Sequence, residues 1–130
     1  LLAQEFLYTE FDWRIGVLDN QPLYACRYFM VKDHWQIYRH GNRTDSGGFE
    51  TLPIADVPHS VVETALKATK PIGDSLYGVD LKERDGKGCV IEVNDNPNVD
   101  KGVEDKYLGM DLYRRFMSTM LKRMEARRGH

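Results

Sequence analysis

The sequence has few cysteines, no paired histidine motif and no long apolar run, and each shortage excludes a class of protein. The two cysteines and four histidines show no metal-ligand spacing, so a zinc site is not expected. Cys26 and Cys89 both lie in apolar, strand-like runs. This predicts buried thiols in a reducing compartment, hence a cytoplasmic protein, with a single disulfide as the alternative.

The charge balance and the missing catalytic motifs narrow the function further. A formal net charge of −2 gives no electrostatic reason to expect nucleic acid or a membrane surface as a partner. No apolar run approaches the length of a membrane span. No Ser-His-Asp or Cys-His arrangement is visible, so nucleophilic catalysis by a side chain is not expected.

Length and composition indicate one ordinary globular domain. The 130 residues are 42% hydrophobic and 29% charged, enough for a modest core within a single domain, 1–130. Leu1-Leu2-Ala3 is followed at once by Gln4-Glu5, so it is neither a signal peptide nor a span. The chain lacks an initiator methionine and opens within an expected strand. We therefore expect a fragment of a longer protein.

Hydrophobic periodicity predicts an α+β fold, an antiparallel β-sheet with two helices packed on one face. Pro58 opens the first helix, with Ser60 and Glu63 at capping-box spacing, and Pro71 ends it. Residues 40–57 lack periodicity and are expected to form a loop. The expected strands are 1–7, 12–18, 23–31 and 35–39. A second helix is expected over 110–127, with a stripe predicted to pack in the core: Leu112, Phe116, Met117, Met120, Leu121 and Met124.

The most informative segment is an acidic hairpin, 78–94. Both arms alternate apolar and polar residues around Asp85-Gly86, a strong hairpin signal. A three-residue loop, 85–87, places Asp80 directly opposite Glu92, with Asn94 on the same face. A two-residue loop would place the two carboxylates on opposite faces.

Two adjacent carboxylates are unfavourable without a cation between them. Magnesium suits such a pair, since it is held by one or two carboxylates together with phosphates and waters. The alternative is a solvated polar face that Lys82 and Arg84 partly neutralise.

Two parts of the chain, 4–14 and 78–97, together resemble a known family. Gln4-Glu5-Phe6-Leu7 looks like the hinge that holds adenine in the ATP-grasp carboxylate–amine ligases, and Asp12-Trp13-Arg14 resembles their Asp-x-Arg motif. Gly78-Val79-Asp80 and the run from Glu92 to Pro97 look like the two magnesium-binding strands and the following loop. The resemblance covers nearly all of the chain, and it is closest to the RimK-like glutamate ligases, with glutathione synthase nearby.

The resemblance implies a fold, a reaction and a set of site residues. The chain would be the C-terminal subdomain of an ATP-grasp fold, with the N-terminal half of the protein missing. The implied cofactors are ATP and Mg²⁺, with Mn²⁺ possible. The implied metal ligands are Asp80, Glu92 and Asn94, and the implied cofactor-binding residues are Gln4, Glu5, Phe6, Leu7 and Asp12.

Arg14 would contact the transferring phosphate, its alternative being an ion pair with Asp12 along the strand. Arg39 and Asn42 lie where relatives carry a substrate-binding Arg-x-Asn, although the spacing here is one residue longer.

The implied reaction joins a carboxylate to an amine through an acyl phosphate, with an amino acid such as glutamate as one partner. The isolated fragment is expected to be inactive, and its sheet edge to be able to pair with another copy in a homo-oligomer. Two alternatives stay open, a metal-dependent phosphohydrolase using Asp80 and Glu92 and a non-catalytic interaction module.

Overall fold

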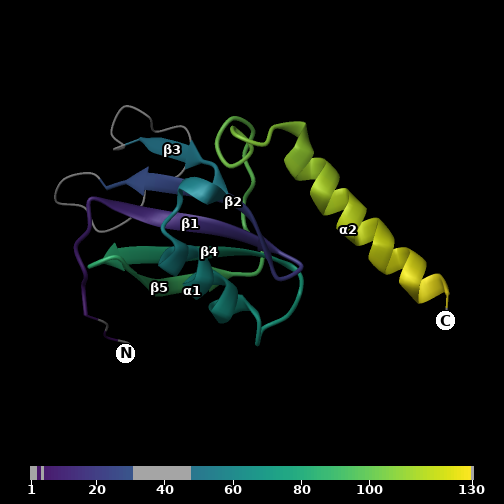
Figure 1. Ribbon diagram of the computed structural model, residues 1–130, viewed down its shortest axis with the longest axis horizontal. Helices are drawn as coiled ribbons and strands as arrows, with labels where there is room; N and C mark the ends of the chain where they lie inside the picture. The colour runs from purple at the N-terminus through teal and green to yellow at the C-terminus, as the bar shows by residue number, and fades with distance from the viewer. Residues whose placement is uncertain (1–2, 4, 31–47, 130) are drawn as a thin grey trace.

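The computed structural model describes residues 3, 5–30 and 48–129, which form a five-stranded antiparallel sheet and two α-helices (Figure 1). The strands follow the order β3-β2-β1-β4-β5 across the sheet. The predicted α+β class is confirmed. The strands are β1 (Phe11–Leu18), β2 (Gln21–Phe29), β3 (Phe49–Leu52), β4 (Leu76–Arg84) and β5 (Lys87–Asn94). The helices are α1 (His59–Thr69), α2 (Met110–Arg128) and a short 3₁₀ turn, η1 (Ile54–Asp56).

The sequence correctly predicted the strands β1 and β2 but did not predict β3 at the edge of the sheet. β1 and β2 fall where strands were predicted. Ala3 and residues 5–7 lie in no strand, contrary to the expectation for 1–7, and the expected strand 35–39 lies outside the described residues. Within the expected loop, residues 49–56 form β3 and η1 instead. β3 was missed because its four residues are too few to show a period.

The two helices contact opposite faces of the sheet, whereas the expectation placed both on one face. Along β1, Ile15 and Val17 point toward α1 and join its core cluster. Leu112, at the start of α2, belongs to a second cluster with Tyr24 and Tyr28. We call the side that also carries Arg14 and Asp80 the polar face. Side chains alternate between the faces, and β1, β2, β3 and β4 each contribute side chains to both clusters.

Helix α1 starts and ends near the predicted residues, but its cap differs from the prediction. Pro58 is the N-cap residue, and no side chain caps the helix. Ser60 Oγ instead accepts a hydrogen bond from the Gly88 N–H at 3.4 Å, which ties α1 to β5. The expected inner face is confirmed, with Val61, Val62, Ala65 and Thr69 buried and Leu66 partly buried.

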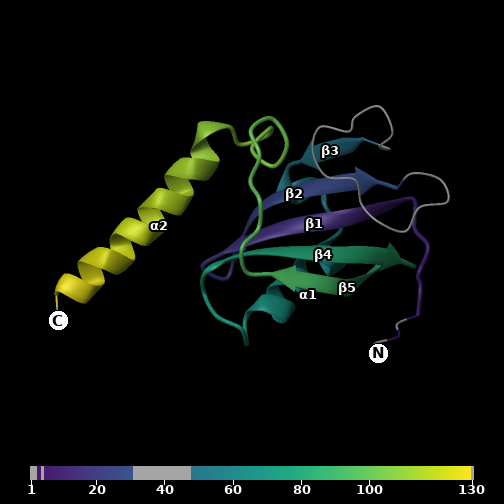
Figure 2. The ribbon, with the colours of Figure 1, turned by 180° about the vertical axis from the view of Figure 1, so that it is seen from behind.

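Helix α2 slants away from the sheet in both views (Figures 1 and 2). Half of the residues in its apolar stripe are exposed. Leu112 is buried, and Phe116 and Met120 pack partly against the second cluster. The predicted core packing is wrong for three residues, which are more than half exposed: Met117 (63%), Leu121 (56%) and Met124 (54%). An amphipathic period predicts an apolar face, but not that this part of the chain covers it.

The cysteines are both free, so the disulfide alternative is excluded. Cys26 is buried, as predicted, whereas Cys89 is exposed. Cys89 lies on β5, which in the described part of the chain is an edge strand with a neighbouring strand on one side only. Among the described residues, no helix combines the length and hydropathy needed to cross a bilayer.

Candidate functional site

The β4–β5 hairpin brings the predicted carboxylates together by an unexpected route. Arg84 pairs with Lys87, so the loop has two residues and not the predicted three. A bulge at Ile91 then shifts the register, and Asp80 lies directly opposite Glu92. The predicted pairing is confirmed, although the loop length on which it was based is wrong.

Asn94 extends this arrangement by one position along the same face. It lies opposite Gly78, two residues from Asp80, and side chains two apart share a face. The Asn94 amide oxygen accepts a hydrogen bond from the Asn96 N–H at 2.9 Å, which closes the turn after β5. Glu92 is exposed and Asn94 is half-buried, so both are accessible beside the more buried Asp80.

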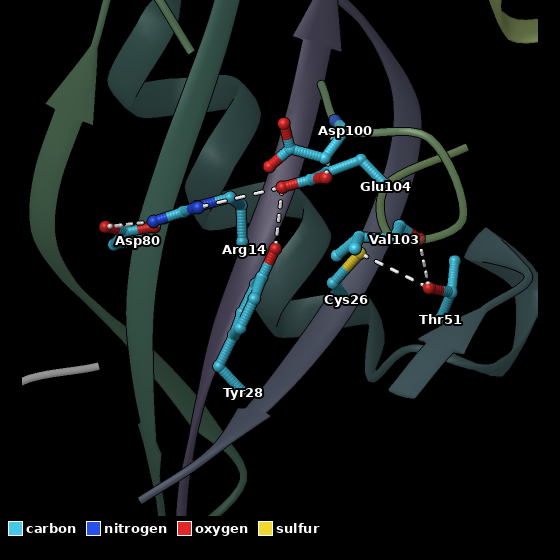
Figure 3. A network of polar contacts seen from close by, with 8 residues as sticks. All are labelled: Arg14, Cys26, Tyr28, Thr51, Asp80, Asp100, Val103 and Glu104. Atoms are coloured by element: carbon cyan, nitrogen blue, oxygen red, sulfur yellow. Dashed lines mark hydrogen bonds and ion pairs between the residues drawn. The ribbon is translucent and has the colours of Figure 1, made fainter. Parts of the chain in front are cut away.

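Arg14 on β1 faces the same site from the neighbouring strand (Figure 3). It pairs with Asp80 through two hydrogen bonds, from Nε to Oδ1 at 2.8 Å and from Nη2 to Oδ2 at 3.2 Å. Arg14 is 5% exposed and Asp80 6%. The alternative partner, Asp12, is therefore wrong, because Arg14 pairs across the strands and not along its own strand.

A second carboxylate, Glu104, reaches Arg14 from the opposite side and was missed from the sequence (Figure 3). Its Oε1 lies 3.9 Å from Arg14 Nη1 and accepts a hydrogen bond from Tyr28 Oη at 2.7 Å. The loop that carries Glu104 is fixed to the sheet by Thr51 Oγ1, which donates to the Val103 carbonyl at 2.6 Å. Residues 99–109 show no period, so no sequence signal places this loop on the polar face.

The charge of Arg14 is stabilised by its surroundings. Burial opposes the charged form, but the hydrogen bonds and negative charge of Asp80 outweigh burial and raise the pKa of Arg14. For Tyr28, by contrast, burial raises the pKa, and the charge of Glu104 raises it further. This tyrosine therefore stays neutral and donates a hydrogen bond to the Glu104 carboxylate. The guanidinium lies 4.9 Å from the centre of the Tyr28 ring, a cation–π contact.

Asp12 has a buried partner of its own. Lys82 Nζ lies 2.6 Å from Asp12 Oδ1 and also donates to Thr9 Oγ1 at 3.0 Å. Thr9 in turn donates to Asp12 at 3.0 Å. Lys82 was expected to offset the hairpin carboxylates, but its ion pair is with Asp12. Two ion pairs, Asp12–Lys82 and Arg14–Asp80, therefore join β1 to β4 on the polar face.

The carboxylates of the site favour a bound cation. Asp80 and Glu104 lie beside the guanidinium of Arg14, and Glu92 lies opposite Asp80, so the single positive charge of Arg14 offsets only part of the three negative charges. Within the described ranges, no group of three or more His, Cys, Asp or Glu side chains is arranged to hold a metal by itself. Two carboxylates and an amide nevertheless suit Mg²⁺, which normally takes its remaining ligands from phosphates and water. The donor set therefore fits a magnesium ion brought with a phosphate group.

The other predicted site residues lie either outside the described residues or in irregular chain. Gln4, Arg39 and Asn42 lie outside the described residues. The hinge-like residues Glu5, Phe6 and Leu7 lie in irregular chain, and their binding of adenine stays a prediction. Phe6 is 58% exposed, and the centre of its ring lies 5.9 Å from Lys82 Nζ.

Comparisons with known proteins identify the fold. No family model matches the chain, and no curated protein matches its sequence. Among solved structures, D-alanine–D-alanine ligase from Bacillus anthracis, complexed with ATP, is similar over 93% of this chain and 43% of its own, with a TM-score of 0.63 and 16% identity. PsnB, an ATP-grasp ligase complexed with its minimal precursor, Mg and ADP, is similar over 77% of this chain and 29% of its own, with a TM-score of 0.51 and 28% identity.

This is the fold of part of an ATP-grasp ligase. The chain spans less than half the length of either protein. The similarity to the D-alanine–D-alanine ligase, at 16% identity, concerns the fold alone. The predicted class of fold is therefore confirmed, whereas the RimK-like subtype and the residue roles stay predictions.

Proposed function

We propose that the chain is the metal- and nucleotide-binding part of an ATP-dependent carboxylate–amine ligase of the RimK-like type. One observation carries the proposal: Asp80 lies directly opposite Glu92, beside a buried and charged Arg14. The similarity to ligases that bind ATP, or ADP with Mg, supports it. The chain would act with further segments of the same protein that complete the nucleotide site.

Each residue has a role that follows from its position. Asp80, Glu92 and Asn94 would hold Mg²⁺, which when bound neutralises phosphate charge. Arg14, kept charged by its partners, would meet the negative charge that spreads over the transferring phosphoryl oxygens. None of these groups acts as a nucleophile, so their work is positioning and charge neutralisation.

The proposed chemistry has two steps. A carboxylate oxygen of the acid attacks the γ-phosphorus of ATP, forming an acyl phosphate and releasing ADP. The amine nitrogen then attacks the acyl carbon, inorganic phosphate leaves, and the nitrogen loses a proton. An amino acid such as glutamate, added to a peptide or a small molecule, is the proposed substrate class.

The test is a screen of the full-length protein for ADP release that depends on an added amino acid. We expect Glu92→Gln to lower this activity roughly 100-fold or more, as when a group that stabilises transition-state charge is removed. The matched control is Glu63→Gln, which changes a half-exposed carboxylate on α1, on the other side of the sheet.

The outcomes separate the candidate functions. Full activity in Glu92→Gln would refute the assignment. ADP release that is independent of any amine would indicate a phosphohydrolase instead. The 130-residue chain by itself is expected to release little ADP.

A further inference from the structure

The side chain of Glu104 is held rigidly at the edge of the candidate site. It is 1% exposed, and both of its oxygens have partners. Oε1 accepts a hydrogen bond from Tyr28 Oη at 2.7 Å, and Oε2 accepts one from the Asp100 N–H at 2.9 Å. The Glu104 carboxylate therefore has one fixed position, next to Arg14 (Figure 3).

A buried carboxylate is costly unless a cation accompanies it, so its presence here requires a reason. A neutral amide has one acceptor oxygen, so it could accept the hydrogen bond from Tyr28 or the one from the Asp100 N–H, but not both. An amide would also lack the negative charge, which lies 3.9 Å from Arg14 Nη1. Glu104 is thus a second counter-ion to the guanidinium, on the side away from Asp80.

The second counter-ion matters because the proposed function, on which this inference rests, gives Asp80 two roles. Asp80 pairs with Arg14, and it also binds the cation. Both Asp80 oxygens accept hydrogen bonds from Arg14 in this structure. A cation on Asp80 would draw on the same oxygens and repel the guanidinium. We propose that Glu104 is a positioning residue, whose fixed charge keeps Arg14 in the site when Asp80 binds a cation.

The test compares Glu104→Gln with Tyr28→Phe in the full-length protein. Glu104→Gln removes the charge and the acceptor for the Asp100 N–H, while it keeps the size of the side chain and an acceptor oxygen for Tyr28. Tyr28→Phe removes the hydrogen bond to the same oxygen and keeps the charge. The dissociation constant of Mn²⁺ in the presence of ATP is measured by electron paramagnetic resonance, with thermal melts to confirm folding.

We expect Glu104→Gln to weaken Mn²⁺ binding roughly tenfold, the size of effect typical when a group supporting a metal ligand is changed. Tyr28→Phe should weaken it much less. We also expect Glu104→Gln to lower kcat with little change in KM for the acid. An unchanged Mn²⁺ affinity in Glu104→Gln, or an equal loss in Tyr28→Phe, would overturn the inference.

The results that would overturn this inference alone differ from those that would also overturn the proposed function. Wild-type protein that binds no Mn²⁺ with ATP, or an Asp80→Asn variant that binds it normally, would overturn both. If Glu104→Gln fails to fold, Glu104→Asp replaces it, since it keeps the charge but withdraws the carboxylate from Arg14. A smaller loss of Mn²⁺ affinity, about threefold, is then expected from the incomplete withdrawal, and no loss would overturn the inference.

Discussion

Replacing Arg14 with methionine should strongly destabilise the fold, because it leaves two buried carboxylates without their cation. Asp80 is 6% exposed and Glu104 1%. Breaking a buried ion pair by removing one partner costs about 3–5 kcal/mol. We therefore expect Arg14→Met to lower the free energy of unfolding by about that amount, a large share of the roughly 5–15 kcal/mol typical of a domain. Urea unfolding at pH 7, followed by circular dichroism, measures the change.

The matched control adds Asp80→Asn to Arg14→Met. The double variant removes both charges of the Arg14–Asp80 pair but leaves Glu104 buried near the site. It should therefore recover part of the loss, with a coupling energy of about 1–3 kcal/mol between the two substitutions. A loss below about 1 kcal/mol in Arg14→Met, the range of exposed ion pairs, would refute this account of the pair.

Three further predictions concern the sheet and its buried side chains. Gly16→Ala should cost about 1–3 kcal/mol in urea unfolding, because its Cβ would lie 2.1 Å from Tyr24 Cε1; unchanged stability would contradict this close approach. DTNB at pH 8 should label Cys89 rapidly and Cys26 only on unfolding, since burial excludes the reagent and raises the pKa of Cys26 to about 12; two fast thiols would count against the burial of Cys26. In unfolding measurements at a series of pH values, the free energy of unfolding should fall as pH rises past about 9–10. Burial raises the pKa of Cys26, Tyr24 and Tyr28, so the folded state keeps protons that the unfolded state releases. A free energy of unfolding that stays constant at alkaline pH would contradict this prediction.

For the β4–β5 hairpin, the sequence pattern predicted the position of the turn but not the bulge in β5. Asp85-Gly86 correctly marked the turn, and both residues have positive φ, 54° and 76°, as a tight two-residue turn requires. The pairing of Asp80 with Glu92 was nevertheless predicted from a longer loop. A bulge at Ile91 supplies the missing residue of register, and no simple alternation reveals a bulge.

Long-range contacts account for what the sequence did not reveal at the site. Glu104 meets Tyr28 across 76 residues of chain, within a loop that has no period of its own. The partner of Asp12 was also missed, because Lys82 reaches it from another strand. By contrast, α1 and the central strands were predicted well, because their apolar residues recur at the spacing of the buried face of each element.

The central claim is that Asp80, Glu92 and Asn94 hold the metal ion that accompanies ATP. A crystal structure of the full-length protein with Mn²⁺ and a non-hydrolysable ATP analogue tests it most directly, because the anomalous signal locates the ion. We predict a peak at roughly 2.0–2.2 Å from oxygens of Asp80 and Glu92, the distance typical of small, hard divalent cations. A bound nucleotide whose metal lies away from both carboxylates would contradict the account.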